Sequence, residues 1–91
     1  MNRIRQINLD YLVDRINEVT KSPMSSYTTK DGSILKANIG NYHLDYAYGG
    51  VRLVRMVNKQ GGIEEISGTG FGTKRELYAW MQAFLAGATH R

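Results

Sequence analysis

The chain has 91 residues, of which 42% are hydrophobic and 22% charged, and its formal net charge is +4. This size and composition predict one domain over residues 1–91 and exclude a disordered chain, while the positive charge excludes a mimic of DNA. The absence of cysteine excludes disulfide frameworks and thiolate metal sites. Charges interrupt every apolar run of residues 1–19, so we expect a soluble, cytoplasmic protein without a signal peptide or a membrane span.

A first helix is predicted over residues 8–20, with Asn8 as its N-cap and Pro23 beyond its end. Its apolar stripe consists of Leu9, Leu12, Val13, Ile16 and Val19. Asp10, Asp14 and Glu18 recur on the opposite side. A cation site would need converging ligands from elsewhere, so a solvated helix face is the favoured interpretation.

Short β-rich runs follow, separated by turn dipeptides. Those dipeptides are Asp31-Gly32, Gly40-Asn41, Gly49-Gly50 and Gly61-Gly62. They predict strands near 33–39, 42–48, 51–57 and 63–67, with a possible edge strand at 25–29. This pattern is typical of an antiparallel meander.

The final helix has the clearest signals in the chain. Thr73 and Glu76 have the spacing of a capping box, and Gly87 is expected to end the helix. Its apolar stripe consists of Leu77, Trp80, Met81, Phe84 and Leu85. We therefore predict an α+β fold of helix, three- to four-stranded antiparallel meander and helix, with both helices packed on one sheet face.

The turns also predict which residues share a sheet face. With two-residue turns at Gly40-Asn41 and Gly49-Gly50, the face under the helices carries Leu35, Ala37, Ile39, Tyr42, Leu44, Tyr46, Tyr48, Val51, Leu53 and Val57. Trp80 and Phe84 are expected to pack over Tyr46 and Leu53. Tyr42, Tyr46 and Tyr48 are interpreted as core residues in preference to a platform on which nucleic-acid bases stack.

The opposite face has an apolar centre with cations around it, which suits a partner surface. We predict a protein-binding surface formed by Ile34, Lys36, His43, Arg52, Val54 and Met56. A second layer over this face, or a contact between two copies of the chain, is the alternative.

The turn before the last helix is rich in glycine and basic residues. Backbone N–H groups at a helix start can hold an anion, which predicts phosphate contacts by Gly70, Gly72, Thr73, Lys74 and Arg75. The spacing matches neither a Walker A loop nor a dinucleotide-binding turn, and a plain connection is the alternative.

Catalytic patterns do not occur in the sequence. His43 and His90 are the only histidines, and neither has converging partners in the sequence. We therefore expect a non-enzymatic protein without a metal or cofactor.

The run Tyr-Gly-Gly-x-x-Leu-Val-Arg, a later Gly-Gly turn and a final helix ending in Leu-x-Gly resemble small, mostly uncharacterised proteins encoded by tailed bacteriophages and prophages. The matching residues are Tyr48, Gly49, Gly50, Leu53, Val54, Arg55, Gly61, Gly62, Leu85 and Gly87, all in the C-terminal half. The resemblance implies a phage accessory protein that binds, and in some cases inhibits, a host enzyme or defence system.

A second resemblance, of topology only, is to the double-stranded-RNA-binding domain, whose last helix opens on a basic turn at the position of residues 70–75. The departures are a fourth strand, the missing Gly-Pro-x-His loop, and Trp80 and Met81 in place of small residues. We thus expect a protein partner or homodimer first, and a nucleic acid as the alternative.

Overall fold

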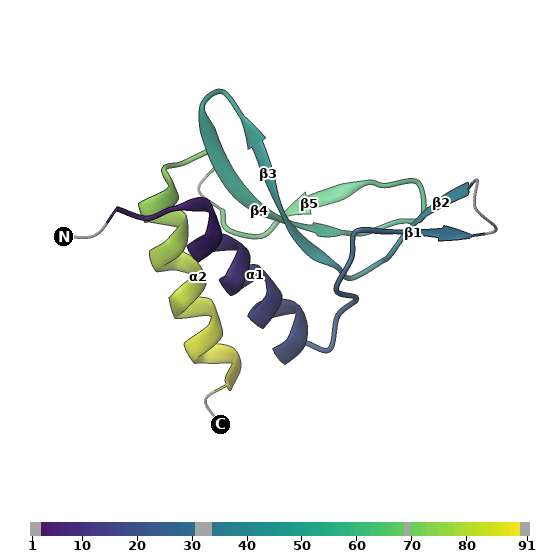
Figure 1. Cartoon of the computed structure of the whole chain (residues 1–91), viewed down its shortest axis with the longest axis horizontal. Helices are drawn as coiled ribbons and strands as arrows, with labels where there is room; N and C mark the ends of the chain where they lie inside the picture. Colours follow the sequence, from purple (N-terminus) through teal and green to yellow (C-terminus); the bar gives the residue numbers. More distant parts are fainter. Residues whose placement is uncertain (1–2, 31–33, 69, 90–91) are drawn as a thin grey trace.

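Both helices lie on one face of a three-stranded sheet, and a separate two-stranded hairpin projects from its far end (Figure 1). The structure is a computed structural model that describes residues 3–30, 34–68 and 70–89. Its elements are α1 (Gln6–Val19), β1 (Tyr27–Lys30), β2 (Ile34–Ala37), β3 (Tyr42–Ala47), β4 (Gly50–Met56), β5 (Ile63–Glu65) and α2 (Lys74–Thr89). The predicted α+β class, with both helices on one sheet face, is confirmed.

Local capping explains where the helices begin. Thr73 and Glu76 form the predicted capping box, in which the Thr73 N–H donates to Glu76 Oε1 at 2.9 Å and the Glu76 N–H donates to Thr73 Oγ1 at 3.1 Å. Helix α1 begins earlier than predicted, because Asn8 lies inside the first turn and accepts a hydrogen bond from the Arg5 N–H at 2.8 Å. Gly87 does not end α2, because its backbone stays helical instead of turning left-handed.

The strands form two sheets instead of one meander. Strands β1 and β2 pair with each other, and β3, β4 and β5 form an antiparallel meander in that order. The predicted hairpin across Gly40-Asn41 is therefore wrong. The chain turns there and attaches to the end of β4, since the Gly40 N–H donates to the Met56 carbonyl at 2.8 Å and the Met56 N–H donates to the Asn41 carbonyl at 2.8 Å. The Asp31-Gly32 turn lies outside the described residues.

The turn of the β3–β4 hairpin is shifted by one residue from the prediction. Its central residues are Tyr48 and Gly49, with φ of 54° and 74°, whereas Gly50 already belongs to β4. The pairing shifts by two residues, so that Tyr46 faces Val51. Because side chains alternate with a period of two, a shift of two leaves each residue within β3 and β4 on its predicted face.

The main core lies between the helices and the inner face of the sheet. Its buried residues are Leu9, Leu12, Val13, Ile16, Val51, Leu53, Leu77 and Met81. Trp80 and Phe84 are only partly buried, and they stack on each other with ring centroids 5.3 Å apart. Phe84 faces the ring of Tyr42, at 6.0 Å, and Tyr46 remains half exposed, so the predicted packing of Trp80 and Phe84 over Tyr46 is wrong.

The outer face of β4 is also covered. Val54 and Met56 are 0% and 1% exposed, which contradicts the predicted apolar centre of a partner surface. Asn41, which pairs with Met56, also donates a side-chain hydrogen bond to the Pro23 carbonyl at 2.7 Å, so the chain before β1 is tied to the end of β4. Strand parity identifies the face on which a residue lies, but it does not say whether another segment covers that face.

Candidate binding groove at the hairpin tip

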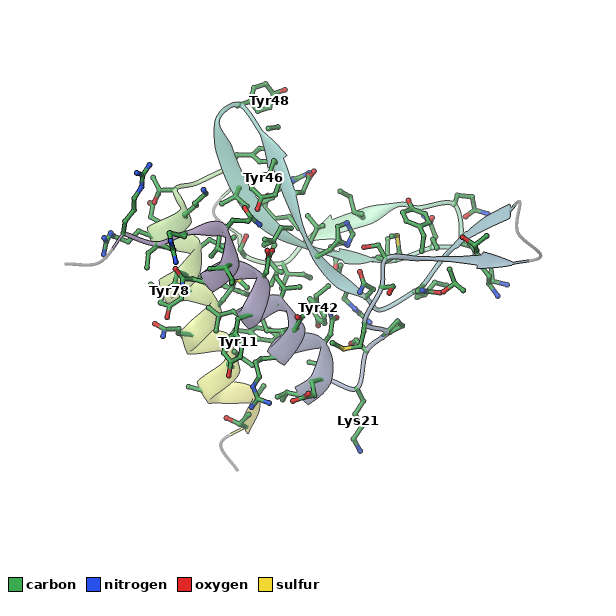
Figure 2. The ribbon with its side chains drawn as sticks, viewed as in Figure 1. Tyr11, Lys21, Tyr42, Tyr46, Tyr48 and Tyr78 are labelled. Atoms are coloured by element: carbon green, nitrogen blue, oxygen red, sulfur yellow. The ribbon has the colours of Figure 1, made fainter. Side chains whose placement is uncertain are left out.

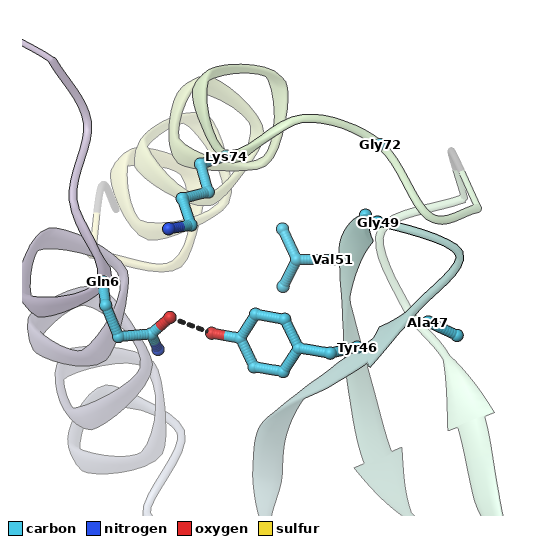
Figure 3. A pocket seen from close by; sticks show the side chains of 8 residues that line it. Gln6, Tyr46, Ala47, Gly49, Val51, Gly72 and Lys74 are labelled. Atoms are coloured by element: carbon cyan, nitrogen blue, oxygen red, sulfur yellow. Dashed lines mark hydrogen bonds between the residues drawn. The ribbon is translucent and has the colours of Figure 1, made fainter.

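An open groove lies between the tip of the β3–β4 hairpin and the starts of both helices (Figure 3). We call it the hairpin-tip groove, and it is lined by Gln6, Tyr46, Ala47, Gly49, Gly50, Val51, Gly72 and Lys74. Its volume is about 370 Å³ and its lining is mostly apolar. These residues come from α1, β3, β4 and α2, from the hairpin turn and from the turn before α2, so only the tertiary structure brings them together.

Tyr46 crosses this groove from the sheet to the first helix. Its hydroxyl donates a hydrogen bond to Gln6 Oε1, which fixes the ring between β3 and α1 (Figure 3). Partial burial raises the pKa of Tyr46, and the nearby Asp10 carboxylate raises it further, while the bond to Gln6 lowers it. The phenol is therefore neutral at physiological pH and acts as a hydrogen-bond donor.

Cations gather at one end of the groove, which we call its mouth. A second hollow shares Gly49 and Lys74 with it and is further lined by Arg3, Ile4, Thr73 and Arg75. Both helices begin at this end of the molecule, and the start of a helix carries a partial positive charge (Figure 1). The mouth is therefore electropositive.

Two aromatic rings meet at the tip of the β3–β4 hairpin. Tyr48 is 96% exposed at the hairpin tip, where it points away from the body of the protein (Figure 2). The ring of Phe71 meets it edge to face, with centroids 5.7 Å apart. Tyr48 was predicted to share the core face, but its left-handed position in the turn carries its side chain into solvent.

The backbone of the glycine-rich turn is not open to an anion as predicted. The Gly70 N–H donates to Glu65 Oε2 at 2.8 Å, the Gly72 N–H donates to the Val51 carbonyl at 3.1 Å, and the Thr73 N–H is used by the capping box. Two carboxylates of the chain itself thus occupy the positions that a phosphate would take. Of the predicted phosphate site, Lys74 lines the groove, and Lys74 and Arg75 both line the adjoining hollow.

Arg52 was predicted to face a partner, but it holds the chain together. Its Nε donates to Asp45 at 2.9 Å, its Nη1 donates to Glu65 at 3.1 Å, and its guanidinium lies 4.4 Å from the centre of the Phe71 ring. The Gly70 N–H first, and then Arg52, hold the pKa of Glu65 below its usual range. These contacts fix the turn before α2, and no local sequence signal pointed to them.

The other residues of the predicted partner surface do not gather around Arg52. Lys36 is exposed on β2, in a hollow that Lys59 also lines. His43 is half buried, its Nδ1 lies 3.2 Å from Asn41 Oδ1, and burial lowers its pKa despite the opposing charge of Asp45. Ile34 pairs with Lys30 in the backbone, but its side chain lies outside the described residues. The predicted surface is therefore divided between two sheets.

Within residues 3–30, 34–68 and 70–89, no group of three His, Asp or Glu side chains is placed to hold a metal ion. No helix in the described part of the chain is long and apolar enough to cross a membrane.

Comparisons of the chain with protein-family models, with curated proteins and with solved structures find no match. The resemblance to phage-encoded proteins therefore stays a prediction.

Proposed function

We propose that this protein is a small non-enzymatic binding module that holds a protein partner in the hairpin-tip groove. The observation that carries the proposal is a mostly apolar groove that adjoins, at Gly49 and Lys74, a hollow lined by Arg3 and Arg75. The resemblance to phage accessory proteins implies a host enzyme or defence protein as the partner, and the bacterial cytoplasm as the location.

The lining of the groove suits an apolar side chain of the partner. Val51 is buried at its base, Tyr46 is 49% exposed at its wall, and the glycines of the hairpin leave room for close approach. Protein interfaces draw most of their binding energy from a few residues that fill such hollows. An apolar anchor is a feature of proteins and not of a phosphate backbone.

The cations at the mouth suit carboxylates next to that anchor. Arg3 and Lys74 are exposed and lie at the electropositive start of the two helices. Charges at an interface rim mainly speed association and select against partners of the wrong charge. We therefore propose a partner segment in which acidic residues lie next to an apolar one.

A nucleic acid is the second candidate, and one observation favours it. Tyr48 is exposed at the hairpin tip against Phe71, on which the Arg52 guanidinium lies, and aromatic rings next to positive charge are the usual platform for single-stranded nucleic acid. The occupied N–H groups of Gly70, Gly72 and Thr73 favour contacts by side chains over a backbone phosphate clamp.

The experiment compares three forms of the full chain as bait in a bacterial lysate with and without nuclease. These are the wild type, the double variant Arg3→Glu/Lys74→Glu, and the control Lys59→Glu, which reverses an exposed cation outside the groove. The proposal expects a protein that the wild type and the control capture regardless of nuclease and that the double variant loses. Capture that is equal for all three forms contradicts it.

A direct titration with a labelled single-stranded oligonucleotide at low salt tests nucleic acid as the ligand. If nucleic acid is the ligand, Kd should be tighter than the nonspecific range of about 10⁻⁴–10⁻⁶ M and should weaken steeply with salt. Tyr48→Ala should then weaken binding by about five- to 150-fold, because stacking on one base contributes about 1–3 kcal/mol. Binding that is weak and is unchanged in Tyr48→Ala would reject nucleic acid as the ligand.

A further inference from the structure

One edge of the three-stranded sheet is unpaired over most of its length. Strand β3 lies at the edge of the order β3–β4–β5. At its first residue, the buried side chain of Asn17 takes the place of a neighbouring strand: the Tyr42 N–H donates to Asn17 Oδ1 at 2.8 Å, and Asn17 Nδ2 donates to the Tyr42 carbonyl at 2.9 Å. The N–H and C=O of Tyr42 therefore point away from β4.

In an antiparallel pair, the backbone groups of successive residues point alternately to the two edges of a strand. Every second residue of β3 therefore points to the same edge as Tyr42. Leu44 and Tyr46 direct their N–H and C=O groups to the same outer edge as Tyr42. Their partners on β4 agree, because Leu53 and Val51 direct their own backbone groups away from β3, toward Ile66 and Gly72. Within the described ranges, no hydrogen bond joins the Leu44 or Tyr46 backbone to a further strand.

The space beside this edge is open. A hollow of about 330 Å³ lies between α1 and β3, and it is lined by Gln6, Asp10, Val13, Asp14, His43, Leu44 and Tyr46. It includes residues from both faces of β3, so it follows the edge of the strand. An added strand would lie about 4.8 Å from β3.

The charge of the hollow selects the occupant. Asp10 and Asp14 are exposed on the side of α1 that lines it, and neither forms a salt bridge in the described part of the chain. A second copy that paired β3 with β3 would direct its own two aspartates toward these, and like charges would oppose that dimer. A segment with lysine or arginine would instead meet opposite charge.

We propose that the β3 edge binds an extended, basic segment of a partner protein, which adds a fourth strand beside Leu44 and Tyr46. Main-chain hydrogen bonds to these two residues hold the segment, as in other cases of strand addition. Basic side chains on its helix-facing side contact Asp10 and Asp14. This surface shares Gln6 and Tyr46 with the hairpin-tip groove, but it carries Asp10 and Asp14 where the groove adjoins cations. The two proposals are tested with different variants, so they can fail independently.

The test uses a short acetylated and amidated peptide of alternating valine and lysine, titrated into the ¹⁵N-labelled full chain. Binding should shift the amide resonances of Leu44 and Tyr46 and slow their hydrogen exchange. Two further versions of the peptide carry N-methyl groups on alternate residues, one on the odd positions and one on the even positions. In one of them the methyl groups replace the N–H donors that face β3, and this version should lose binding. Unchanged Leu44 and Tyr46 amides at millimolar peptide, or equal binding by both methylated peptides, would overturn the proposal.

Variants test the choice of a basic segment. Asp10→Asn/Asp14→Asn should weaken the lysine peptide by about three- to tenfold, whereas Glu18→Gln, on the same helix but outside the hollow, should leave it unchanged. A peptide with glutamate in place of lysine should bind more weakly to the wild type than to the double variant. Equal binding of the lysine and glutamate peptides would overturn the proposal. A dimer that protects the Leu44 and Tyr46 amides from hydrogen exchange without peptide would also overturn it, because a second copy would then occupy the edge.

Discussion

Gly50 lies so close to Phe71 that a Cβ atom added to Gly50 would be 2.5 Å from the Phe71 carbonyl oxygen. This approach lets Val51 pair with Gly72, through N–H to carbonyl distances of 2.9 and 3.1 Å. The turn before α2 is thereby joined to the hairpin, and the hairpin-tip groove forms between them. The glycine is needed for space, and not for a left-handed turn.

The two adjacent glycines of the hairpin should therefore respond differently to substitution. Gly50→Ala should lower the free energy of unfolding by about 1–3 kcal/mol, because the methyl group collides with backbone that cannot rotate away. Gly49→Asn should change it by only about 0.5 kcal/mol, because Gly49 has open space around it and asparagine tolerates its positive φ. Urea denaturation of both variants checks this, and a Gly50→Ala midpoint equal to that of the wild type would contradict the close approach.

Asn17 should be essential for stability although it is polar. It is 1% exposed, and its amide satisfies both backbone groups of Tyr42. Asn17→Ala leaves these groups without their partner and should cost about 2–4 kcal/mol. Tyr11→Ala, on an exposed position of the same helix, is the control and should change the unfolding free energy by less than about 1 kcal/mol. Similar unfolding midpoints for Asn17→Ala and Tyr11→Ala would show that water replaces the hydrogen bonds of the Asn17 amide.

Met81 should stabilise the core more than its exposed neighbour. Met81 is fully buried between the helices and the sheet, so Met81→Ala removes buried methylene groups and leaves a cavity. The expected cost is about 2–5 kcal/mol. Gln82→Ala, one residue later and exposed, should be nearly neutral. Thermal unfolding followed by circular dichroism measures both variants. Equal unfolding midpoints would mean that Met81 does not lie on the buried face of α2.

Glu65 should make stability depend on pH in the acid range. The Gly70 N–H and Arg52 lower its pKa in the folded state, so the unfolded chain binds the proton more readily. The stabilisation is fully present above the ordinary glutamate pKa of about 4.3, and it is lost as the pH falls through the lower pKa of the folded state. Stability should therefore decrease with acid below about pH 5.

Urea midpoints between about pH 7 and pH 2 measure this dependence. Glu65→Gln should flatten the decrease, whereas Glu64→Gln, at the exposed neighbouring position, should keep it. Some dependence should remain in Glu65→Gln, because hydrogen bonds from Thr73 lower the pKa of Glu76 as well. An unchanged acid profile in Glu65→Gln would mean that the contacts to Gly70 and Arg52 do not persist in solution.

Local and periodic features could be predicted because they depend on residues a few positions apart. The Thr73–Glu76 capping box involves one turn of backbone, and the apolar stripes of both helices follow from helical geometry. The sheet faces of β3 and β4 were predicted correctly even though the turn was misplaced, because a shift of two residues preserves parity. These signals were enough for the α+β class and the placement of the helices.

The candidate sites depended on contacts that no short-range signal contains. Asn17 meets Tyr42 across 25 positions, and Arg52 joins Asp45, Glu65 and Phe71 from three different segments. Val54 and Met56 are buried although strand parity places them on the face of β4 that was expected to meet a partner. A sequence pattern states which face of an element is apolar, but the path of the connecting chain decides what covers that face, and therefore which surface remains for a partner.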